Sequence, residues 1–379
     1  MTGWNRPKVT ETIRADQPIW FISDLHLGDG TPSDVFFGKD RHLMALIESI
    51  PKEGVLVVVG DAMDFHQAWT FTRILRAHQP LLSAMSELAK EGRLFYVVGN
   101  HDYDISFYKD LLNFRVCDEL HIEQRFLVTH GYEYDPYIGS DLEGSHLATK
   151  IHHLLERYLN TWIRVPLGEF YTFPNRLLYW TVHKYASMVR LSSFIGKRFG
   201  LHGIGRKQLE HLDYWARTQM GDPMCMFNPI MKRLQEDKWE AIVCGHSHLP
   251  GRIEKGGRLY INTGSWTFAS SHYALWQNDR FSVQDWLTGR EFTDHFYRPI
   301  ISGAIDEKDF WQWWRENYMG FLRFREGEER QGRLRGWESH IRDYQYLAQF
   351  DPLQNRDSAE EQGPVRQDKN KPLTEEIPP

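Results

Sequence analysis

Five short polar segments, rich in Asp, His and Asn, constrain this chain more than any other feature. Each follows an apolar run typical of a buried strand, such as the runs at 19–23 and 55–59. In α/β proteins the functional loops lie at the carboxyl ends of such strands. The fold is therefore expected to place these distant segments at the ends of strands. The segments are Asp24-Leu25-His26, Gly60-Asp61, Gly99-Asn100-His101-Asp102, His130-Gly131 and Gly245-His246-Ser247-His248.

Apolar runs alternate with helical patterns along the first 130 residues, which predicts α/β layering. Helical periodicity covers 41–50 and 81–90. The expected strands are 19–23, 55–59, 94–98, 126–129, 241–244, 258–262 and a segment around 282–286.

The pattern changes between about 140 and 240, where amphipathic helices are predicted over 145–160, 174–190 and 208–220. A helical insert within the α/β domain explains this change. An aromatic helix is expected at 306–324, and the sequence from 351 lacks apolar residues, which is typical of disorder. The predicted organisation is an α/β domain at 1–139 and 236–300, a helical insert or lid at 140–235, a C-terminal helical extension at 301–350 and a disordered tail at 351–379.

Composition narrows the class of protein. The net charge of −6 argues against a general nucleic-acid binder. Three widely spaced cysteines, Cys117, Cys225 and Cys244, form no disulfide framework, so a reducing cytoplasm is expected. The first residues lack the apolar core of a signal peptide, and no apolar run approaches the roughly 18 residues of a membrane span. Attachment to a membrane surface stays open.

The residue types in the five segments suit a pair of divalent cations. Two ions about 3.5–4 Å apart need a shared anionic ligand and further ligands on each side. Asp61 suits the shared position, because a carboxylate can bridge two ions. Asp24 and His26 can face one ion from an extended turn, and Asn100 offers a carbonyl oxygen. Mixed oxygen and nitrogen ligands favour Mn²⁺, with Fe or Zn²⁺ as alternatives, over Ca²⁺.

The order of the segments resembles the calcineurin-like metallophosphoesterase superfamily, whose pattern is DxH, GD, GNH(D/E), H and GHxH. The resemblance covers about 20–280 and implies a two-sheet β-sandwich flanked by helices. It also implies a hydrolase that cleaves a phosphate ester or diphosphate with metal-activated hydroxide. By this resemblance His101 is the catalytic histidine beside the metals. One metal would bind Asp24, His26, Asp61 and His248, and the other Asp61, Asn100, His130 and His246.

Each segment taken alone also has a simpler interpretation. A single Asp-x-His or Gly-Asn is ordinary in turns, and a metal-free interaction scaffold of the same fold would have lost ligand positions, whereas none is lost here. Asp64 either positions a ligand or is a solvated turn residue. Asp102 either orients His101, and so belongs to the catalytic group, or caps a helix.

The insert carries a basic segment without acidic residues. Arg190, Arg198, Arg206 and Lys207 are candidates for gripping an anionic headgroup, with glycines and aromatic residues nearby. The alternative is a solvated basic face over a subdomain core. The aromatic and basic residues of 310–325 either dock onto the main domain or lie at a membrane surface.

A narrower resemblance is to bacterial UDP-2,3-diacylglucosamine diphosphatases. Helices interrupt that family between the HG and GHxH motifs, as they do here between His130 and His246. The chain departs from that family by His101, where Arg is typical, and by a longer insert. The preferred substrate is a nucleotide- or lipid-linked diphosphate at the inner membrane surface. The alternative is a phosphodiesterase or phosphatase that acts on soluble nucleotides or phosphoproteins.

Overall fold

The structure is a computed structural model. It describes residues 8–135 without 32, 33 and 37, residues 223–294 without 268 and 269, residue 297, and single residues and short helical runs between 150 and 199. No helix among these residues has the length and apolar character needed to cross a bilayer.

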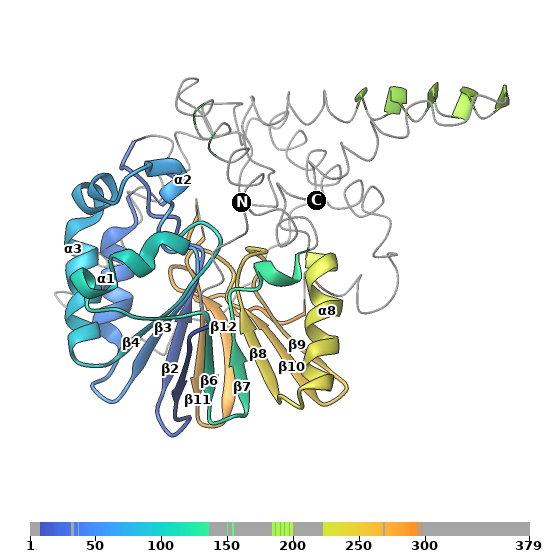
Figure 1. The fold of residues 1–379 in the computed structure, drawn as a ribbon. Helices are drawn as coiled ribbons and strands as arrows, with labels where there is room; N and C mark the ends of the chain where they lie inside the picture. The colour runs from blue at the N-terminus through green and yellow to red at the C-terminus, as the bar shows by residue number, and fades with distance from the viewer. Residues whose placement is uncertain are drawn as a thin grey trace, which may run out of the picture.

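Two sheets of six strands each form the centre of the described chain (Figure 1). One sheet has the order β1 (Thr10–Ile13), β6 (Glu119–Ile122), β7 (Phe126–Val128), β8 (Ala241–Cys244), β10 (Arg258–Asn262) and β9 (Gly251–Lys255). The other has the order β12 (Arg280–Asp285), β11 (His272–Gln277), β2 (Ile19–Ile22), β3 (Val55–Val59), β4 (Leu94–Val97) and β5 (Arg115–Cys117).

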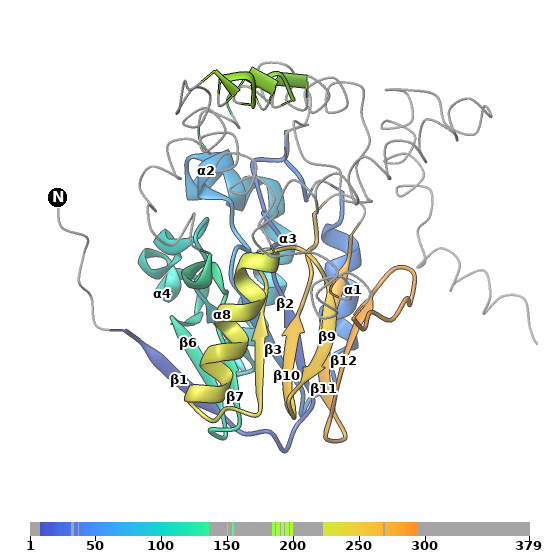
Figure 2. The ribbon, with the colours of Figure 1, turned by 90° about the vertical axis from the view of Figure 1, so that its right-hand side faces the viewer.

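Helices cover the outer faces of both sheets (Figures 1 and 2). Helices α1 (Asp40–Ser49) and α3 (Phe71–Lys90) pack on the sheet that contains β3. Helix α8 (Pro223–Glu236) packs on the sheet that contains β8. Shorter elements lie in the connections: α2 (Phe65–Ala68), η1 (Tyr103–Phe107), α4 (Lys109–Leu112) and η2 (Tyr132–Tyr134). The predicted two-sheet sandwich with flanking helices is confirmed.

The central strands are apolar on both faces because both faces are buried. In β3, Val55, Val57 and Val59 point into the core between the sheets, together with Phe126 and Val243 of the opposite sheet. Leu56 and Val58 point the other way, into the core under α1 and α3. Side chains alternate along a strand, so a strand covered on both sides is a continuous apolar run.

The strand directions bring the polar segments to one edge. Strands β2, β3 and β4 are mutually parallel, and β7 is parallel to β8. Their carboxyl ends therefore share one end of the sandwich, the end at which α2 lies (Figure 1). Each of the five polar segments follows a different one of these five strands.

Helix α8 lies almost wholly within the range predicted for the insert, 140–235. It packs on the sandwich, with Met226, Phe227 and Ile230 buried against Ile242 and Tyr260. The domain boundaries stay a prediction. Apart from a few residues, the rest of the insert lies outside the described residues, as do the predicted extension at 301–350 and the tail at 351–379.

Candidate active site

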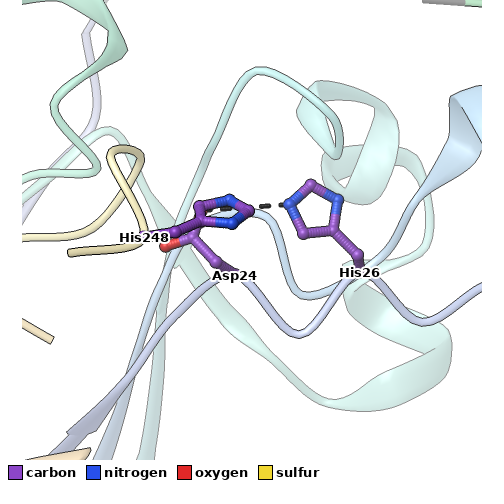
Figure 3. Close-up of side chains that lie close together, drawn as sticks. All are labelled: Asp24, His26 and His248. Atoms are coloured by element: carbon purple, nitrogen blue, oxygen red, sulfur yellow. Dashed lines mark ion pairs between the residues drawn. The ribbon is translucent and has the colours of Figure 1, made fainter. Parts of the chain in front are cut away.

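Metal-ligand candidates from four of the five segments meet at the end of the sandwich, and His101 of the remaining segment lies beside them. The donor atoms of Asp24, His26 and His248 lie within 4.8 Å of one another, and those of Asp61, His130 and His246 form a second such group. Figure 3 shows the first group, in which the imidazoles of His26 and His248 both face the Asp24 carboxylate. The structure thus brings together residues more than 200 positions apart.

Asp24 and Asp61 each accept hydrogen bonds with one carboxylate oxygen, and the other oxygen of each faces imidazole rings. Asp24 Oδ2 accepts a hydrogen bond from His246 N (3.0 Å) and from the Ser23 hydroxyl. Its Oδ1 lies 3.2 Å from His248 Nε2, 3.9 Å from His26 Nε2 and 4.0 Å from His130 Nε2. A carboxylate oxygen held among three imidazole nitrogens is a candidate cation ligand.

Asp61 lies between the two groups. Its Oδ1 accepts a hydrogen bond from His101 N at 2.7 Å. Its Oδ2 lies 3.2 Å from His130 Nε2 and 4.0 Å from His26 Nε2. One oxygen thus approaches a histidine of each group. This geometry suits the shared ligand that a pair of cations needs.

His26, His130 and His246 are each oriented by a hydrogen bond at the ring nitrogen that points away from Asp24 and Asp61. His130 Nδ1 donates to the Val59 carbonyl oxygen at 2.7 Å, and His26 Nδ1 lies 3.3 Å from Asp64 Oδ2. These contacts leave Nε2 of both rings for a cation. His246 uses Nε2 toward Asp135 Oδ2 at 3.1 Å, which leaves Nδ1. Metal-binding histidines are held in this way, because the second nitrogen fixes the tautomer and the ring orientation.

Four buried polar atoms test whether cations fit here. Asp24 Oδ1, His26 Nε2, Asn100 Oδ1 and His130 Nε2 are shielded from solvent and have no hydrogen-bond partner within the described part of the chain. Buried polar atoms are normally paired, because an unpaired one costs about 1–3 kcal/mol. Asp24 Oδ1 lies within 4.0 Å of His26 Nε2 and of His130 Nε2, and all four atoms are good ligands of divalent metals. The residues present fit a pair of metal ions.

A family model now decides the identity. The model described as calcineurin-like phosphoesterase matches residues 17–250, more than half of the chain. The chain belongs to the calcineurin-like phosphoesterase family. Its match ends after His248, so it spans all five polar segments.

Two curated relatives match a shorter part of the chain than the family model does. Proteins called UDP-2,3-diacylglucosamine hydrolase from Bordetella parapertussis and Bordetella bronchiseptica are each 30% identical over 126 residues. These matches cover 31% of this chain, and the chain spans 46% of the length of each of these curated relatives.

Among solved structures, the phosphoesterase Yfce from E. coli has 15% sequence identity and a TM-score of 0.34, covering 72% of this chain and 96% of that chain. The cold-active protein-tyrosine phosphatase of a Shewanella species has 14% identity and a TM-score of 0.33, covering 76% and 82%.

The family's glycines are required here by close approach to the ligands. A Cβ atom at Gly60 would overlap the His130 imidazole, and one at Gly99 would overlap the Asp61 carboxylate and backbone. A Cβ atom at Gly245 would overlap the Asp24 carboxylate. The three glycines that precede polar segments thus let a backbone pass directly against a ligand of another segment.

The backbone of the ligands is itself strained. Asp24, His26, Asp61, His246 and His248 all have positive φ angles, between 50° and 64°. A non-glycine residue in this region costs on the order of 1–3 kcal/mol, and such residues gather at functional sites. These five predicted metal ligands are among twelve non-glycine residues with positive φ in the described part of the chain, and the other seven are not ligand candidates.

Burial and charge set the protonation of the metal-free site. Burial raises the pKa of Asp61, but the imidazolium charges of His130 and His101 outweigh it and hold that pKa well below its usual value. Burial lowers the pKa of His130, but Asp61 and Asp24 outweigh it and raise the pKa to about 10. The pKa of His26 is lowered, chiefly by burial. Without metal, a proton on His130 balances the carboxylate charge.

His101 lies next to both groups. Its ring is 15% exposed, and its centroid lies 4.7 Å from that of His26. Its Nδ1 is 3.2 Å from Asp64 Oδ1. His101 thus occupies the place expected of a group that assists at the substrate, although its role stays a prediction.

The prediction that Asp102 orients His101 is wrong. The Asp102 carboxylate accepts hydrogen bonds from Gly99 N (2.7 Å), Ala62 N (2.8 Å) and the Tyr96 hydroxyl (2.5 Å). It is fully buried and joins the two loops that carry Asp61 and Asn100. Nor does its side chain cap η1, so its role is to hold the loops.

Asp64 takes the position that Asp102 was expected to fill. It is 1% exposed and caps α2 by accepting from His66 N (3.1 Å) and Gln67 N (2.9 Å). From this cap its carboxylate faces His26 and His101 together. The positioning alternative for Asp64 is therefore favoured over a solvated turn.

Sequence reasoning missed Asp135, the partner of His246. Asp135 is 1% exposed and follows His130 by five positions, after η2. An acidic residue shortly after the His130-Gly131 segment was the available signal. Of the four predicted substrate residues, Arg198 is described as exposed and helical, and Arg190, Arg206 and Lys207 lie outside the described residues.

Proposed function

We propose that the protein is a metal-dependent hydrolase of phosphate esters or diphosphates that works with two divalent ions. One observation carries the proposal: Asp24 Oδ1 and Asp61 Oδ2 each lie within 4.0 Å of His26 Nε2 and His130 Nε2, and Asp24 Oδ1 and both nitrogens are buried without a hydrogen-bond partner among the described residues. The family to which the chain belongs supports the same reaction class.

The proposed division of labour follows from the contacts. Two bound cations supply electrostatic stabilisation of the phosphoryl oxygens and lower the pKa of a water molecule. The carboxylates of Asp24 and Asp61 hold the cations and supply the negative charge that balances them. His101 uses Nδ1 toward Asp64, so its Nε2 is the nitrogen that can reach a phosphoryl oxygen or a leaving group. Asp64 keeps that ring and the His26 ring in place.

For the metal we propose Mn²⁺. The candidate donors are carboxylate and amide oxygens and imidazole nitrogens, a mixture that suits Mn²⁺, Fe or Zn²⁺ better than Ca²⁺. No cysteine sulfur belongs to the donor groups found among the described residues, which removes the strongest preference for Zn²⁺.

For the substrate we propose a nucleotide-linked or lipid-linked diphosphate, reached at the inner membrane surface from the cytoplasm. The support is the name of the two Bordetella relatives, the position of the insert between His130 and His246, and its basic residues. We propose that the insert is a lid whose Arg190, Arg198, Arg206 and Lys207 grip the anionic headgroup.

His101 favours a second candidate, a phosphodiesterase or phosphatase that acts on soluble nucleotides or phosphoproteins. A histidine at this position is the general pattern of the superfamily, whereas the diacylglucosamine group resembled in the sequence has Arg.

A hydrolysis screen tests the proposal and separates the two candidates. Protein reloaded with Mn²⁺ is assayed on a UDP-linked diacyl sugar, UDP-glucose, a cyclic nucleotide, a phosphopeptide and bis-p-nitrophenyl phosphate. The preferred candidate predicts the highest kcat/KM on the acylated nucleotide sugar. Preference for the soluble substrates selects the second candidate. Absence of hydrolysis of every compound by the Mn²⁺, Fe²⁺ and Zn²⁺ forms would contradict both.

Paired substitutions test the lid. Arg198→Gln with Arg206→Gln is expected to raise KM for the acylated nucleotide sugar and to leave hydrolysis of bis-p-nitrophenyl phosphate unchanged. Lys90→Gln with Lys232→Gln makes the same change of net charge at exposed positions of α3 and α8 and serves as the control. An equal loss on both substrates would assign the basic segment to folding, and no loss on either would make it a solvated face.

A further inference from the structure

A buried histidine outside the metal groups joins helix α3 to the loop that follows His26. His78 is 2% exposed and lies inside α3, where its φ and ψ angles of −121° and 26° interrupt the helix. Pro80 follows two residues later, and its ring cannot fit against the carbonyl of Arg76 in a regular helix. The kink therefore has a cause in the sequence, and the histidine is at the kink.

Both nitrogens of His78 are engaged by carboxylates. Nδ1 lies 2.8 Å from Asp40 Oδ1, and Nε2 lies 3.0 Å from Asp34 Oδ2. A ring that donates to two acceptors carries two N–H groups and is therefore the imidazolium form. Burial lowers the pKa of His78, but the two carboxylates outweigh it and raise the pKa to about 9. The edge of the Phe36 ring is the remaining described aromatic contact.

Asp34 links His78 to the backbone beside the metal groups through hydrogen bonds. The side chain is fully buried, and Oδ2 accepts from Gly28 N (3.1 Å) and Gly30 N (2.9 Å) as well as facing His78. Its Oδ1 accepts from Phe36 N at 2.9 Å. One carboxylate thus holds the backbone at Gly28, Gly30 and Phe36.

The turn held by Asp34 is continuous with ligand-bearing backbone. Gly28 has no space for a side chain, because a Cβ atom there would overlap Asp34 and Gln67. The preceding residue, Leu27, donates to the Ala62 carbonyl oxygen (2.9 Å) and accepts from Asp64 N (3.0 Å). A shift of Gly28 would therefore move Leu27, and with it the contacts of Asp64 and His26.

We propose that His78 is a positioning residue of the metal centre, which acts through Asp34 on the Gly28–Gly30 turn and so fixes His26. The inference rests on the proposed metal function. It assigns to the imidazolium a task that neutral imidazole cannot perform, because only the form with two N–H groups donates to both Asp34 and Asp40. The residues that face the ligands are thus supported by a charged brace on the helical side of the sheet.

The test is the Mn²⁺ affinity of His78→Gln, measured by titration calorimetry beside wild type, with amide exchange of residues 27–31 as a second readout. Gln carries both of its N–H donors on one nitrogen, whereas His78 serves the two carboxylates from two separate ring nitrogens. We expect affinity to fall about 10–100-fold, the range found when supporting residues of metal ligands are removed, and exchange at 27–31 to accelerate. Met85→Ala, a buried change on the same helix, is the control: it lowers the melting temperature and leaves affinity unchanged.

The outcomes separate this inference from the function it depends on. Wild type that binds no Mn²⁺, Fe²⁺ or Zn²⁺ would overturn the proposed metal function. Wild type that binds, beside a folded His78→Gln with the same affinity and the same exchange, would overturn the role of His78. If His78→Gln does not fold, Asp40→Asn decides, because it weakens the brace from a side chain that is 26% exposed. It is then expected to lower Mn²⁺ affinity several-fold, and wild-type affinity in this variant would overturn the inference.

Discussion

The two groups of metal-ligand candidates differ in how they are built. In the group of Asp61, His130 and His246 every member is buried, and His130 is held by the backbone carbonyl of a central strand. In the group of Asp24, His26 and His248 one member, His248, has 39% of its side chain exposed, and His26 is held by the side chain of Asp64. We call these the closed group and the open group.

This difference indicates that the closed group and the open group have separate tasks. The closed group depends on β3, β7 and β8, whose positions are fixed by the core between the sheets. The open group depends on loops that reach solvent, on α2 and on the Asp34–His78 brace. The following predictions test this contrast.

The largest effect is expected for Asp61→Ala, because Asp61 is the carboxylate between both groups. Loss of the shared ligand should remove both ions and lower the hydrolysis rate by more than about 10³-fold, beyond the loss of one charge-stabilising donor. Elemental analysis of Mn²⁺-reloaded protein measures the first effect and bis-p-nitrophenyl phosphate hydrolysis the second. Retention of two ions per chain by this variant would contradict a bridging Asp61.

His101→Ala should separate catalysis from metal binding, since His101 is expected to belong to neither group. The rate is expected to fall roughly 10²–10⁴-fold, the range of one acid–base or electrostatic group. Both ions should remain by elemental analysis. Loss of one ion would instead make His101 a ligand, in agreement with its position near His26 and Asp61.

Much of the fold followed from strands buried on both faces. The runs at 55–59, 241–244 and 258–262 coincide with β3, β8 and β10, because such strands leave a continuous apolar signal. Strands β1, β5, β6, β9 and β11 were not predicted. β1 reads Thr-Glu-Thr-Ile, with one buried residue in four, so its pattern does not stand out from a loop. Helix α3 begins ten residues before the predicted start at 81, and it accommodates Pro80 next to a kink at His78.

Site residues could be predicted where they belong to a short sequence motif. The ligand candidates were found because each stands in a short pattern at a strand end. The supporting residues were not, since Asp135, Asp34 and His78 gain their partners only when distant segments pack together. Asp102 shows the same limit: its neighbour in sequence is His101, but its carboxylate turns toward Ala62 and Tyr96.

Asp64→Asn should weaken the open group alone. Asn can still cap α2 but lacks the charge that orients His26, so Mn²⁺ affinity of one ion is expected to fall about 10–100-fold. Asp135→Asn is the matched change at His246 of the closed group. Calorimetric titration should show a different one of two binding steps affected in each variant. The same step weakened in both would mean that the groups do not act separately.

The smallest effect is expected in the pH dependence of Mn²⁺ affinity, which should differ between the two groups. Metal ligands must bind without their protons, so a site with a protonated histidine releases a proton when the metal enters. The pKa of His130 is raised to about 10, chiefly by Asp61, whereas the pKa of His26 is lowered by burial. At neutral pH His130 of the closed group therefore has a proton to lose, and His26 of the open group has none.

The sign of the pH effect follows from this contrast. Between about pH 7 and about pH 9, Mn²⁺ affinity of the closed group should rise close to tenfold per pH unit, and that of the open group should stay nearly constant. Metal-free protein gains stability from protonated His130 below its unfolded pKa and loses that gain as pH rises through about 10. Calorimetry in two buffers of different ionisation enthalpy counts the released protons. One proton for one of the two ions is expected, and His130→Gln should abolish it. Equal proton release by both binding steps would remove the distinction between the groups.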